Sequence, residues 1–376
     1  MTLDIRNVTP FVYRCPLDEP VTTSFGTMRD RPMVLVRVED REGAVGWGEI
    51  WCNFPAVGAE HRARLVDSVL APLSCEKTFA SAQEAFEHLT RRTAVLAIQS
   101  GEAGPIAQAI AGLDIALWDL EARRAGQPLW KFLNPGAAPN IQVYASGLNP
   151  TNPEGLALAR QKEGHIAFKL KIGFGIERDV RNLQALRTSL GPAALLMVDA
   201  NQAWDVRTAL DVLPRLEPFQ LQWLEEPLRA DEPWSEWAKL RERTSVPLAA
   251  GENIMGLEAF DLALKSGVLS VVQPDIAKWG GFSGCFPVAK RIIAAGRTYC
   301  PHYLGGGVGL LASAHLLAAA GGDGRLEIDS NPNPLRTLLS GPVQTICDGK
   351  VTLPDRPGLG IEPDAVHLKE YAVSWR

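Results

Sequence analysis

The stretch Phe168-Lys169-Leu170-Lys171-Ile172-Gly173 lies near the middle of the chain, between two segments with helical periodicity. In a strand, successive side chains point to opposite faces, so Lys169 and Lys171 share one face and the apolar residues share the other. A strand between helices is buried on both faces, which predicts that both ammonium groups enter one enclosed space. There they repel, and each lowers the pKa of the other. The pattern therefore requires carboxylates opposite the two lysines.

Short apolar segments alternate with amphipathic helical segments on both sides of this stretch. We expect strands at residues 143–145, 167–172, 195–199, 221–226, 248–252, 271–275, 298–302 and 325–329. Eight strand–helix units predict a (β/α)8 barrel, although the helix after the last strand is vague. A doubly wound open sheet is the alternative fold. Such a sheet usually carries a complete glycine-rich dinucleotide turn after its first strand, and Gly305-Gly306-Gly307 lacks that spacing, so we interpret it as a flexible loop.

A smaller α+β unit is expected before the barrel. Strand patterns at residues 5–14 and 33–49 are followed by helical patterns at residues 61–73, 82–92 and 105–124. The end of the chain is rich in loops, with a strand-like segment at 366–373 that is expected to cross back to the N-terminal unit. We therefore divide the chain into an N-terminal α+β domain (residues 1–125), a barrel domain (126–345) and a returning C-terminal segment (346–376).

The composition is that of an ordinary globular protein, with 46% apolar and 22% charged residues. The formal net charge of −5 and the lack of long basic runs in the sequence argue against nucleic-acid binding. The first six residues are not apolar as in a signal peptide, and no apolar run reaches the length of a membrane span, so we expect a cytoplasmic protein. The six cysteines lack C-x-x-C spacing, which indicates free thiols.

Residues with catalytic chemistry stand at the C-terminal ends of successive predicted strands. They are Lys171, Asp199, Glu225, Glu252, Asp275, His302 and Glu327, at intervals of 28, 26, 27, 23, 27 and 25 residues. One strand–helix unit takes about that much chain, so all of these side chains should project at the same mouth of the barrel, where barrel enzymes keep their active sites. A single charged residue at a strand end often only caps the next helix. A whole series in phase indicates a site.

Three of these residues predict a metal site. Asp199, Glu225 and Glu252 come from neighbouring strands, and three converging carboxylates repel unless a cation lies between them. Ligation by oxygen atoms alone suits Mg²⁺, whereas zinc would require histidine or cysteine beside these strands. Asn201 returns to the same face as Asp199 and could hydrogen-bond a ligand carboxylate. Glu226 should point the other way and make a structural pair.

The remaining residues predict acid–base chemistry. Asp275 beside His302 orients the imidazole and supports its protonated form. Glu327 can donate a hydrogen bond to a bound carboxylate if it is protonated. Removal of a proton next to a carboxylate creates an enediolate, which a divalent cation and a hydrogen-bond donor stabilise. Lys171, with its pKa lowered by Lys169, can serve as the base near neutral pH.

These strand ends resemble the enolase superfamily, and within it the mandelate racemase subgroup. The matching motifs are Lys169-Leu170-Lys171, Val198-Asp199-Ala200-Asn201, Leu224-Glu225-Glu226-Pro227, Gly251-Glu252-Asn253, Gln273-Pro274-Asp275, Pro301-His302 and Leu326-Glu327. The resemblance covers nearly the whole chain. It implies an α/β fold with a modified (β/α)8 TIM barrel and an N-terminal α+β capping domain that the C-terminal segment completes.

The resemblance also implies a role for each matched residue. Asp199, Glu225 and Glu252 would be the Mg²⁺ ligands, Lys171 the base on one face, His302 with Asp275 the acid or base on the other, and Glu327 the electrophilic donor. Muconate-lactonizing and dipeptide-epimerase relatives carry a lysine where this chain has Asp275, and Lys278 is interpreted as a bystander. The specificity loops of the capping domain would fall at residues 22–28 and 51–58, which makes Phe25, Trp51 and Phe54 the expected substrate contacts. These apolar side chains make the loops less polar than a site for a fully hydroxylated sugar acid would suggest.

The expected function is Mg²⁺-dependent abstraction of the α-proton of a small carboxylate substrate, by a sugar-acid dehydratase or a sugar-acid lactone cycloisomerase. A racemase or epimerase remains open, because it would use the same residues. A non-catalytic binding protein on the same barrel would be expected to have lost one of these groups. A metal-dependent hydrolase usually binds its metal through histidines, which the metal-side strand ends lack. We also expect a homo-oligomer, from a dimer to an octamer.

Overall fold

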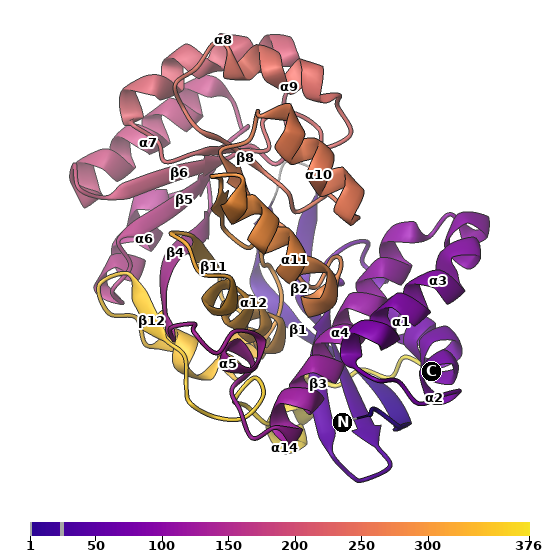
Figure 1. The fold of residues 1–376 in the computed structure, drawn as a ribbon. Coiled ribbons are helices and arrows are strands. Elements are labelled where there is room, and N and C mark those ends of the chain that lie inside the picture. Colours follow the sequence, from indigo (N-terminus) through magenta and orange to yellow (C-terminus); the bar gives the residue numbers. More distant parts are fainter. Residues whose placement is uncertain (1, 23–25) are drawn as a thin grey trace.

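The computed structural model describes residues 2–22 and 26–376, and Phe25, one of the expected substrate contacts, lies outside them. An N-terminal α+β domain stands beside a barrel (Figure 1). The sheet of the N-terminal domain is antiparallel, in the order β1-β2-β3. Its elements are β1 (Ile5–Thr22), β2 (Thr27–Asp40), β3 (Val45–Ile50), α1 (Gly58–Leu65), the π-helical turn η1 (Val66–Leu70), α2 (Ala71–Cys75), α3 (Ala82–Ser100) and α4 (Ala103–Arg124).

Helix α4 packs directly on strand β3. Its apolar residues recur at spacings of three and four, and Ile110, Leu113 and Leu117 are buried. A Cβ atom on Gly48 of β3 would lie 2.0 Å from the carbonyl oxygen of Gly112 on α4, so only glycine allows the two backbones to approach so closely. The predicted helix at residues 105–124 is thus confirmed, and it forms the long central helix of the N-terminal domain.

Parallel strands form the barrel in the order β10-β9-β8-β7-β6-β5-β4-β11. They are β4 (Asn140–Leu148), β5 (Ala167–Lys171), β6 (Leu195–Asp199), β7 (Leu224–Glu225), β8 (Leu248–Ala250), β9 (Val271–Val272), β10 (Thr298–Tyr299) and β11 (Arg325–Asp329). The Arg325 amide donates to Cys300 Sγ at 3.4 Å, which links the two ends of this series. The predicted modified barrel is confirmed, and the open doubly wound sheet is excluded.

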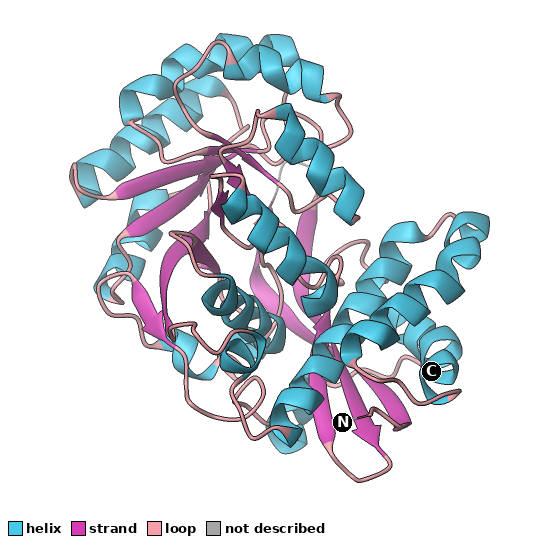
Figure 2. Cartoon of the chain, in the orientation of Figure 1, coloured by secondary structure: helices cyan, strands magenta, loops and turns pink. Residues whose placement is uncertain are grey.

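Helices cover the outside of the strands (Figure 2). They are α5 (Leu129–Leu133), α6 (Pro153–Lys162), α7 (Ile176–Leu190), α8 (Val206–Leu216), the 3-10 turn η2 (Glu217–Phe219), α9 (Trp234–Arg241), α10 (Leu257–Ser266), α11 (Gly281–Ala294) and α12 (Gly307–Ala320). Inside the barrel, Tyr144, Met197 and Trp223 pack with smaller apolar residues of the neighbouring strands. This apolar cluster fills the barrel below the strand ends, so the polar residues gather at one end.

The chain after β11 departs from the regular repeat. A short helix α13 (Pro334–Thr337) and the 3-10 turn η3 (Gly341–Gln344) stand where a long eighth helix would follow, and β12 (Lys350–Thr352) then pairs antiparallel with β4. The strand expected at 366–373 is wrong in its first half, because Asp364 accepts the Val366 amide and begins α14 (Ala365–Leu368), followed by η4 (Lys369–Tyr371). The Val373 amide donates to the Val12 carbonyl at 3.0 Å, so the end of the chain does return to β1.

Buried polar contacts join the N-terminal domain to the barrel. Arg31 of β2 is only 2% exposed and donates to Asp329 at the end of β11, with 2.7 Å between Nη2 and Oδ2. The indole of Trp118 on α4 donates to Ser283 of α11 at 2.9 Å. These contacts hold the N-terminal domain against the C-terminal ends of the strands.

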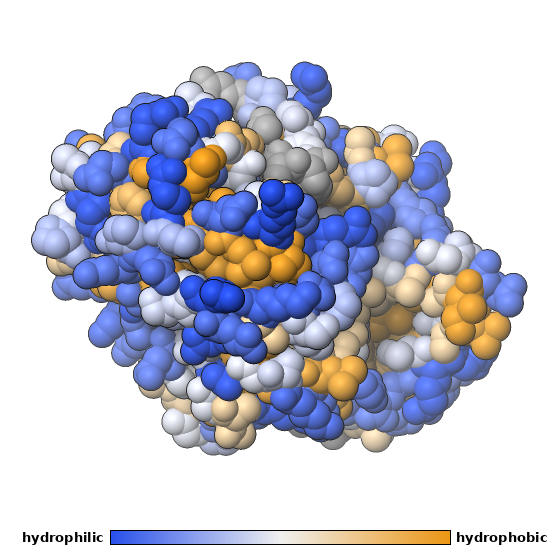
Figure 3. All heavy atoms as spheres, turned by 90° about the horizontal axis from the view of Figure 1, so that it is seen from above, coloured by the Kyte–Doolittle hydropathy of each residue, from blue (hydrophilic) through white to orange (hydrophobic). Residues whose placement is uncertain are grey.

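Seen from above, the surface is mostly hydrophilic with smaller apolar patches between charged regions (Figure 3). Among the described residues, we find no helix that combines the length and the apolar character needed to span a membrane.

Candidate active site

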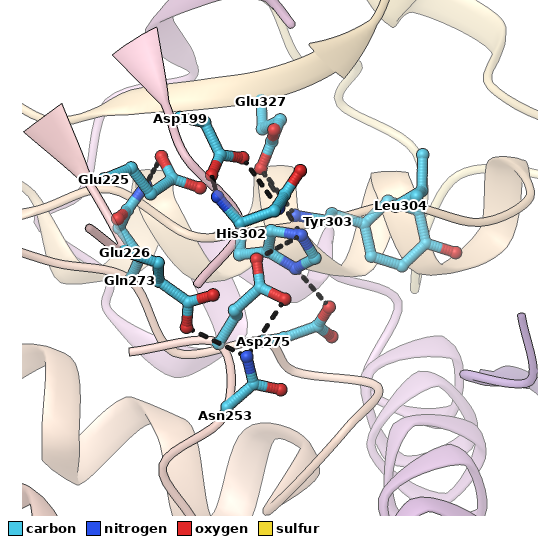
Figure 4. A network of polar contacts seen from close by, with 12 residues as sticks. Asp199, Glu225, Glu226, Asn253, Gln273, Asp275, His302, Tyr303, Leu304 and Glu327 are labelled. Atoms are coloured by element: carbon cyan, nitrogen blue, oxygen red, sulfur yellow. Dashed lines mark hydrogen bonds and ion pairs between the residues drawn. The ribbon is translucent and has the colours of Figure 1, made fainter. Parts of the chain in front are cut away.

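The side chains predicted at the strand ends meet at one end of the barrel. Figure 4 shows five of them close together, namely Asp199, Glu225, Asp275, His302 and Glu327. Strand register places Lys171 beside Asp199 and Asp199 beside Glu225 across β5, β6 and β7. Glu252, Asp275 and His302 follow the ends of β8, β9 and β10, and Glu327 lies within β11. All of them are buried or nearly so, in a part of the protein where charged groups strongly affect one another.

Lys169 lies at the centre of the carboxylates. Its side chain is fully buried, and Nζ donates to both carboxylate oxygens of Glu225 at 2.7 Å and lies 2.8 Å from Oε1 of Glu327. Burial alone would lower the pKa of Lys169, but Glu225 and Glu327 hold it well above its ordinary value. The ring of Tyr144 also faces the ammonium group, with 5.4 Å from Nζ to the ring centroid. Lys169 therefore stays charged and neutralises the buried carboxylates.

Lys171 contacts Asp199 instead, with 2.5 Å between Nζ and Oδ2. Burial lowers the pKa of Lys171, and Lys169 lowers it as well, as predicted from the sequence. Asp199 outweighs both effects, so the pKa of Lys171 is raised and not lowered. Asn201 also binds Asp199, because its backbone amide donates to Oδ1 at 2.7 Å and its side-chain amide donates to Oδ2 at 3.1 Å. Asn201, which the sequence suggested as a ligand to substrate, thus orients the Asp199 carboxylate.

His302 lies between two carboxylates. Its Nδ1 is 2.7 Å from Oδ2 of Asp275, and its Nε2 is 2.9 Å from Oε2 of Glu252. Burial alone would lower the pKa of His302, but Glu252, Glu327 and the hydrogen bond with Asp275 hold it well above its ordinary value. The Asp275 carboxylate is fixed in turn by the backbone amides of Ala277 and Lys278. The structure therefore brings Asp275 and His302 together as an oriented acid–base pair.

Glu327 lies between Lys169 and the loop after β10. Its oxygens accept hydrogen bonds from the hydroxyl of Ser146 and, at 3.1 Å, from the backbone amide of Tyr303. Burial alone would raise the pKa of Glu327, but Lys169 and His302 lower it to about 2. Glu327 is therefore ionised in this arrangement, whereas the electrophilic role expected from the sequence needs its proton.

Lys278, which the sequence analysis set aside as a bystander, contacts the predicted metal site. Its Nζ donates to Oε1 of Glu252 at 2.8 Å and to Oδ1 of Asn253 at 3.1 Å. The same ammonium group lies 4.8 Å from the ring centroid of Trp51, in the geometry of a cation–π interaction. Lys278 thus joins a predicted metal ligand to a loop of the N-terminal domain.

Glu226 does not point away from the site as predicted. Its backbone has a positive φ of 39°, which breaks the alternation of the strand and turns the side chain toward the residues after β8. There Oε1 accepts a hydrogen bond from Asn253 at 2.9 Å. Burial raises the pKa of Glu226 well above its ordinary value, and the neighbouring charges of Glu252 and Asp199 raise it further.

Two further residues orient Glu225 and were missed in the sequence. The indole of Trp223 and the amide of Gln273 donate to its Oε2 at 3.1 and 2.7 Å. Both could have been found by alternation, because Trp223 stands two residues before Glu225 and Gln273 two residues before Asp275, on the same faces of their strands.

The N-terminal domain reaches the site through Glu49, at the end of β3. This carboxylate is 2% exposed and accepts the backbone amides of Gly306 at 2.5 Å and Gly309 at 2.9 Å, at the beginning of α12. A Cβ atom on Gly306 would lie 2.8 Å from Oε1 of Glu49, so the glycines leave room for the carboxylate. Gly305-Gly306-Gly307, interpreted from the sequence as a flexible loop, is therefore held by a side chain from the other domain.

The described substrate-loop residues lie beside each other on the N-terminal domain. The rings of Trp51 and Phe54 are 6.5 Å apart, and the backbone amide of Trp51 donates to the Ala277 carbonyl at 3.4 Å. Trp51 thus packs against the loop after β9, which carries Asp275 and Lys278. These aromatic rings place an apolar wall on the N-terminal side of the strand ends.

The charges of this cluster suit a divalent cation. Six carboxylates lie close together with three lysines and one histidine; they are Asp199, Glu225, Glu226, Glu252, Asp275 and Glu327, with Lys169, Lys171, Lys278 and His302. With all six carboxyl groups ionised and His302 protonated, two negative charges would remain uncompensated. This repulsion acts locally: burial and the acidic neighbours together raise the pKa of Glu225 to about 7, although Lys169 opposes them.

Asp199, Glu225 and Glu252 offer only oxygen atoms, which Mg²⁺ prefers. In the described part of the chain, no three acidic, histidine or cysteine side chains enclose a common point closely enough to hold a metal ion. The reason is local, because each of these carboxylates is turned toward a lysine: Asp199 toward Lys171, Glu225 toward Lys169 and Glu252 toward Lys278. The donor set and the charge excess fit Mg²⁺, and binding would require the carboxylates to exchange these partners.

Two family models match successive parts of the chain. Residues 5–134 match the N-terminal domain of the mandelate racemase / muconate lactonizing enzyme family, and residues 154–367 match the enolase C-terminal domain-like family. D-galactarolactone cycloisomerase from Agrobacterium fabrum is 32% identical, over 95% of this chain and 96% of its own length.

Solved structures are similar over the full length. A mandelate racemase/muconate lactonizing enzyme from Bordetella bronchiseptica RB50 has a TM-score of 0.94 and 57% identity, covering 99% of this chain and 100% of its own. An enolase from Bradyrhizobium, solved in complex with magnesium and mandelic acid, has a TM-score of 0.85 and 30% identity, covering 100% of this chain and 99% of its own.

Proposed function

The chain belongs to the mandelate racemase / muconate lactonizing enzyme family of the enolase superfamily, and from this we propose that it is a Mg²⁺-dependent enzyme that removes the α-proton of a small carboxylate substrate. We propose further that the proton loss leads to expulsion of a β-oxygen, in the reaction of a sugar-acid lactone cycloisomerase or a sugar-acid dehydratase. The likeness to D-galactarolactone cycloisomerase supports this reaction class.

The α-proton of a carboxylate is a very weak acid, because its removal leaves two negative charges on one group. Mg²⁺, held by Asp199, Glu225 and Glu252, would supply the positive charge that stabilises such an enediolate. Lys169 adds a fixed positive charge next to the same carboxylates. Lys169 would therefore contribute positive charge near a bound substrate carboxylate independently of the metal.

One observation carries the proposal: the two acid–base groups come from separate parts of the barrel. Lys171 ends β5, whereas His302 and its partner Asp275 follow β10 and β9, and in the sheet order β5 is separated from β10 by several strands. A substrate between them would present one face to the lysine and the other to the imidazole. One group can then remove the α-proton while the other protonates the departing oxygen.

Lys171 must lose its own proton before it can act as a base. Asp199 stabilises the protonated form of Lys171, whose Nζ donates to Oδ2 at 2.5 Å. A cation bound to the Asp199 carboxylate would weaken the attraction between Asp199 and the Lys171 ammonium group. His302 has the opposite tendency, because Glu252, Glu327 and Asp275 favour the imidazolium. This difference suits Lys171 as base and His302 as acid.

A racemase is the second candidate, since the Bradyrhizobium enolase was solved with mandelic acid. Racemisation would use Lys171 and His302 as bases on opposite faces of one carbon. The two candidates differ in their products. Elimination gives a 2-keto acid or an opened lactone, whereas racemisation gives only the substrate with the opposite configuration at the α-carbon.

The experiment is a substrate screen with Mg²⁺, using acid sugars, their lactones and small α-hydroxy acids. Each reaction is followed both by keto-acid detection and by polarimetry. Keto-acid formation or lactone opening supports the proposal, and a change of optical rotation alone supports the racemase. If no compound of any class loses its α-proton in D₂O, as seen by NMR, the proposed chemistry is wrong.

Variants then test the two faces on whichever substrate reacts. His302→Asn should keep α-proton exchange on the Lys171 face and lower overall conversion by roughly 10²–10⁴-fold. Lys171→Met should lose exchange if the α-proton faces the lysine. Lys239→Met is the matched control, because Lys239 is an exposed lysine on α9 that pairs with nearby Glu236. If both site variants lose exchange and turnover together on every substrate, the two-faced arrangement is refuted.

A further inference from the structure

A polar cavity lies outside the barrel, where a long eighth helix would stand in a regular (β/α)8 fold. Its volume is about 270 Å³. It is enclosed by α6, by the outward side of β11 and by the segment from α13 to η3, which runs in yellow beside α6 and β12 (Figure 1). The lining residues that matter here are Arg160, His165, Ile328, Arg336, Ser340 and Gln344.

The charges next to this cavity do not balance. Arg31 and Arg336 both donate to one carboxylate, that of Asp329, at 2.7 and 3.3 Å. Arg160 has its own partner in Glu163, at 2.8 Å. Three guanidinium groups thus face two carboxylates, and one positive charge is left over. The side chains of Arg31 and Arg336 are only 2% and 12% exposed, so water screens that charge poorly.

Polar groups at the cavity also lack partners. His165 is 2% exposed, and among the described residues its Nδ1 has no hydrogen-bond partner. The Nε of Arg160 is buried and unpartnered in the same part of the structure. Burial and the neighbouring Arg160 lower the pKa of His165 to about 4, so its imidazole is neutral near pH 7 and one ring nitrogen carries a hydrogen to donate.

From these observations we propose that the cavity binds a small oxyanion, of phosphate or short-carboxylate chemistry, between Arg160, Arg336 and His165. Guanidinium groups bind such oxyanions through paired N–H donors, and a neutral imidazole and the Ser340 hydroxyl can complete the shell. Water could fill the same volume, but it could not offset the extra positive charge. The cavity lies on the outer side of β11, whereas Glu327 faces the barrel interior, so this site is separate from the catalytic one.

The test measures anion binding to the full protein by isothermal titration calorimetry near neutral pH. EDTA is present throughout, so that metal-dependent anion binding at the strand ends does not contribute. Sodium phosphate and sodium acetate are compared with sodium chloride at equal ionic strength. Phosphate or acetate should bind saturably beyond the chloride control, and the tighter of the two identifies the oxyanion. Binding should also shift the imidazole NMR signals of His165.

Arg160→Met should weaken oxyanion binding by about tenfold or more, since a charge-assisted hydrogen bond is lost. The variant should fold, because the Arg160 side chain is 27% exposed and its ion pair is with Glu163, three residues further along the chain at the end of α6. The matched control is Arg215→Met, which removes an exposed arginine paired with Glu177 far from the cavity lining and should bind as the wild type does. Equal affinity in the two variants, or chloride binding as tightly as both oxyanions, would overturn the proposal.

Discussion

Replacing Glu49 by glutamine tests how strongly the N-terminal domain holds the loop after His302. The carboxylate accepts two backbone amides at the beginning of α12, one on each oxygen. Glutamine has the same shape, so no cavity forms. Its amide keeps one acceptor and places an NH₂ group against the amide of either Gly306 or Gly309. One buried donor thus loses its acceptor and meets another donor.

The expected cost follows from that single mismatch. A buried donor without an acceptor costs about 1–3 kcal/mol, and more when the lost acceptor was charged. Burial raises the pKa of Glu49 and outweighs the hydrogen bonds from the Gly309 amide, the Tyr303 hydroxyl and the Gly306 amide, which lower it, so desolvation of the carboxylate offsets the added strength of a charged acceptor. We therefore expect Glu49→Gln to lower the free energy of unfolding by about 1–3 kcal/mol.

Urea unfolding followed by tryptophan fluorescence measures this loss. The matched control is Glu39→Gln on β2, which removes a partly exposed carboxylate paired with Arg37 at 2.7 Å. Exposed ion pairs contribute about 0–1 kcal/mol, so this control should change stability little. If Glu49→Gln costs no more than the control, the two amides do not depend on the carboxylate, and the reasoning about the glycine loop is refuted.

Three further predictions concern the site and the core. Lys169→Met leaves Glu225 buried without its counter-ion and should cost about 3–5 kcal/mol in urea unfolding; a loss below about 1 kcal/mol would contradict the role given to this lysine. Glu252→Gln should weaken Mg²⁺ binding in calorimetry and abolish turnover while the circular dichroism spectrum stays unchanged, and an unaltered Mg²⁺ affinity would show the assignment to be wrong. Burial raises the pKa of Asp114 from 3.8 to about 7, so the stability contributed by its neutral form is full below about pH 4 and is lost as the pH rises through 7. Asp114→Asn should remove that loss, and equal pH profiles of stability for the variant and the wild type would disprove it.

The barrel and the positions of its strand-end residues could be predicted because two periods are visible in the sequence. Alternation places Lys169 and Lys171 on one face, and the spacing of about one strand–helix unit brings Asp199 and Glu225 to the same level. Both periods depend only on local geometry. Predictions made from these two periods therefore hold wherever the backbone is regular.

What could not be predicted depends on irregular backbone or on distant contacts. The positive φ of Glu226 turns its side chain to the other side of the strand, and no pattern in the sequence predicts this backbone conformation. Lys278 lies in a turn beyond the short strand β9, where alternation no longer applies, so its contact with Glu252 was missed. The contact between Glu49 and Gly306 joins residues 257 positions apart.

The charge state of Glu327 could not be predicted from the sequence either. Burial favours the protonated carboxyl group, while Lys169 and His302 favour the carboxylate, and the outcome depends on their distances. A sequence shows that these residues exist but not which of the opposing effects is larger.

The buried pair of Arg31 and Asp329 limits how this enzyme can be recombined with its relatives. Arg31 belongs to the N-terminal domain, and Asp329 ends the barrel strand that also carries Glu327. A chimaera that took its N-terminal domain from a relative without an arginine at this place would remove one of the two arginines that donate to the Asp329 carboxylate, in a position that is 6% exposed. Grafts of the expected specificity loop should therefore be cut within residues 51–58, after β3, so that Arg31 stays with its native barrel. Whole-domain exchange would need both members of the pair to move together.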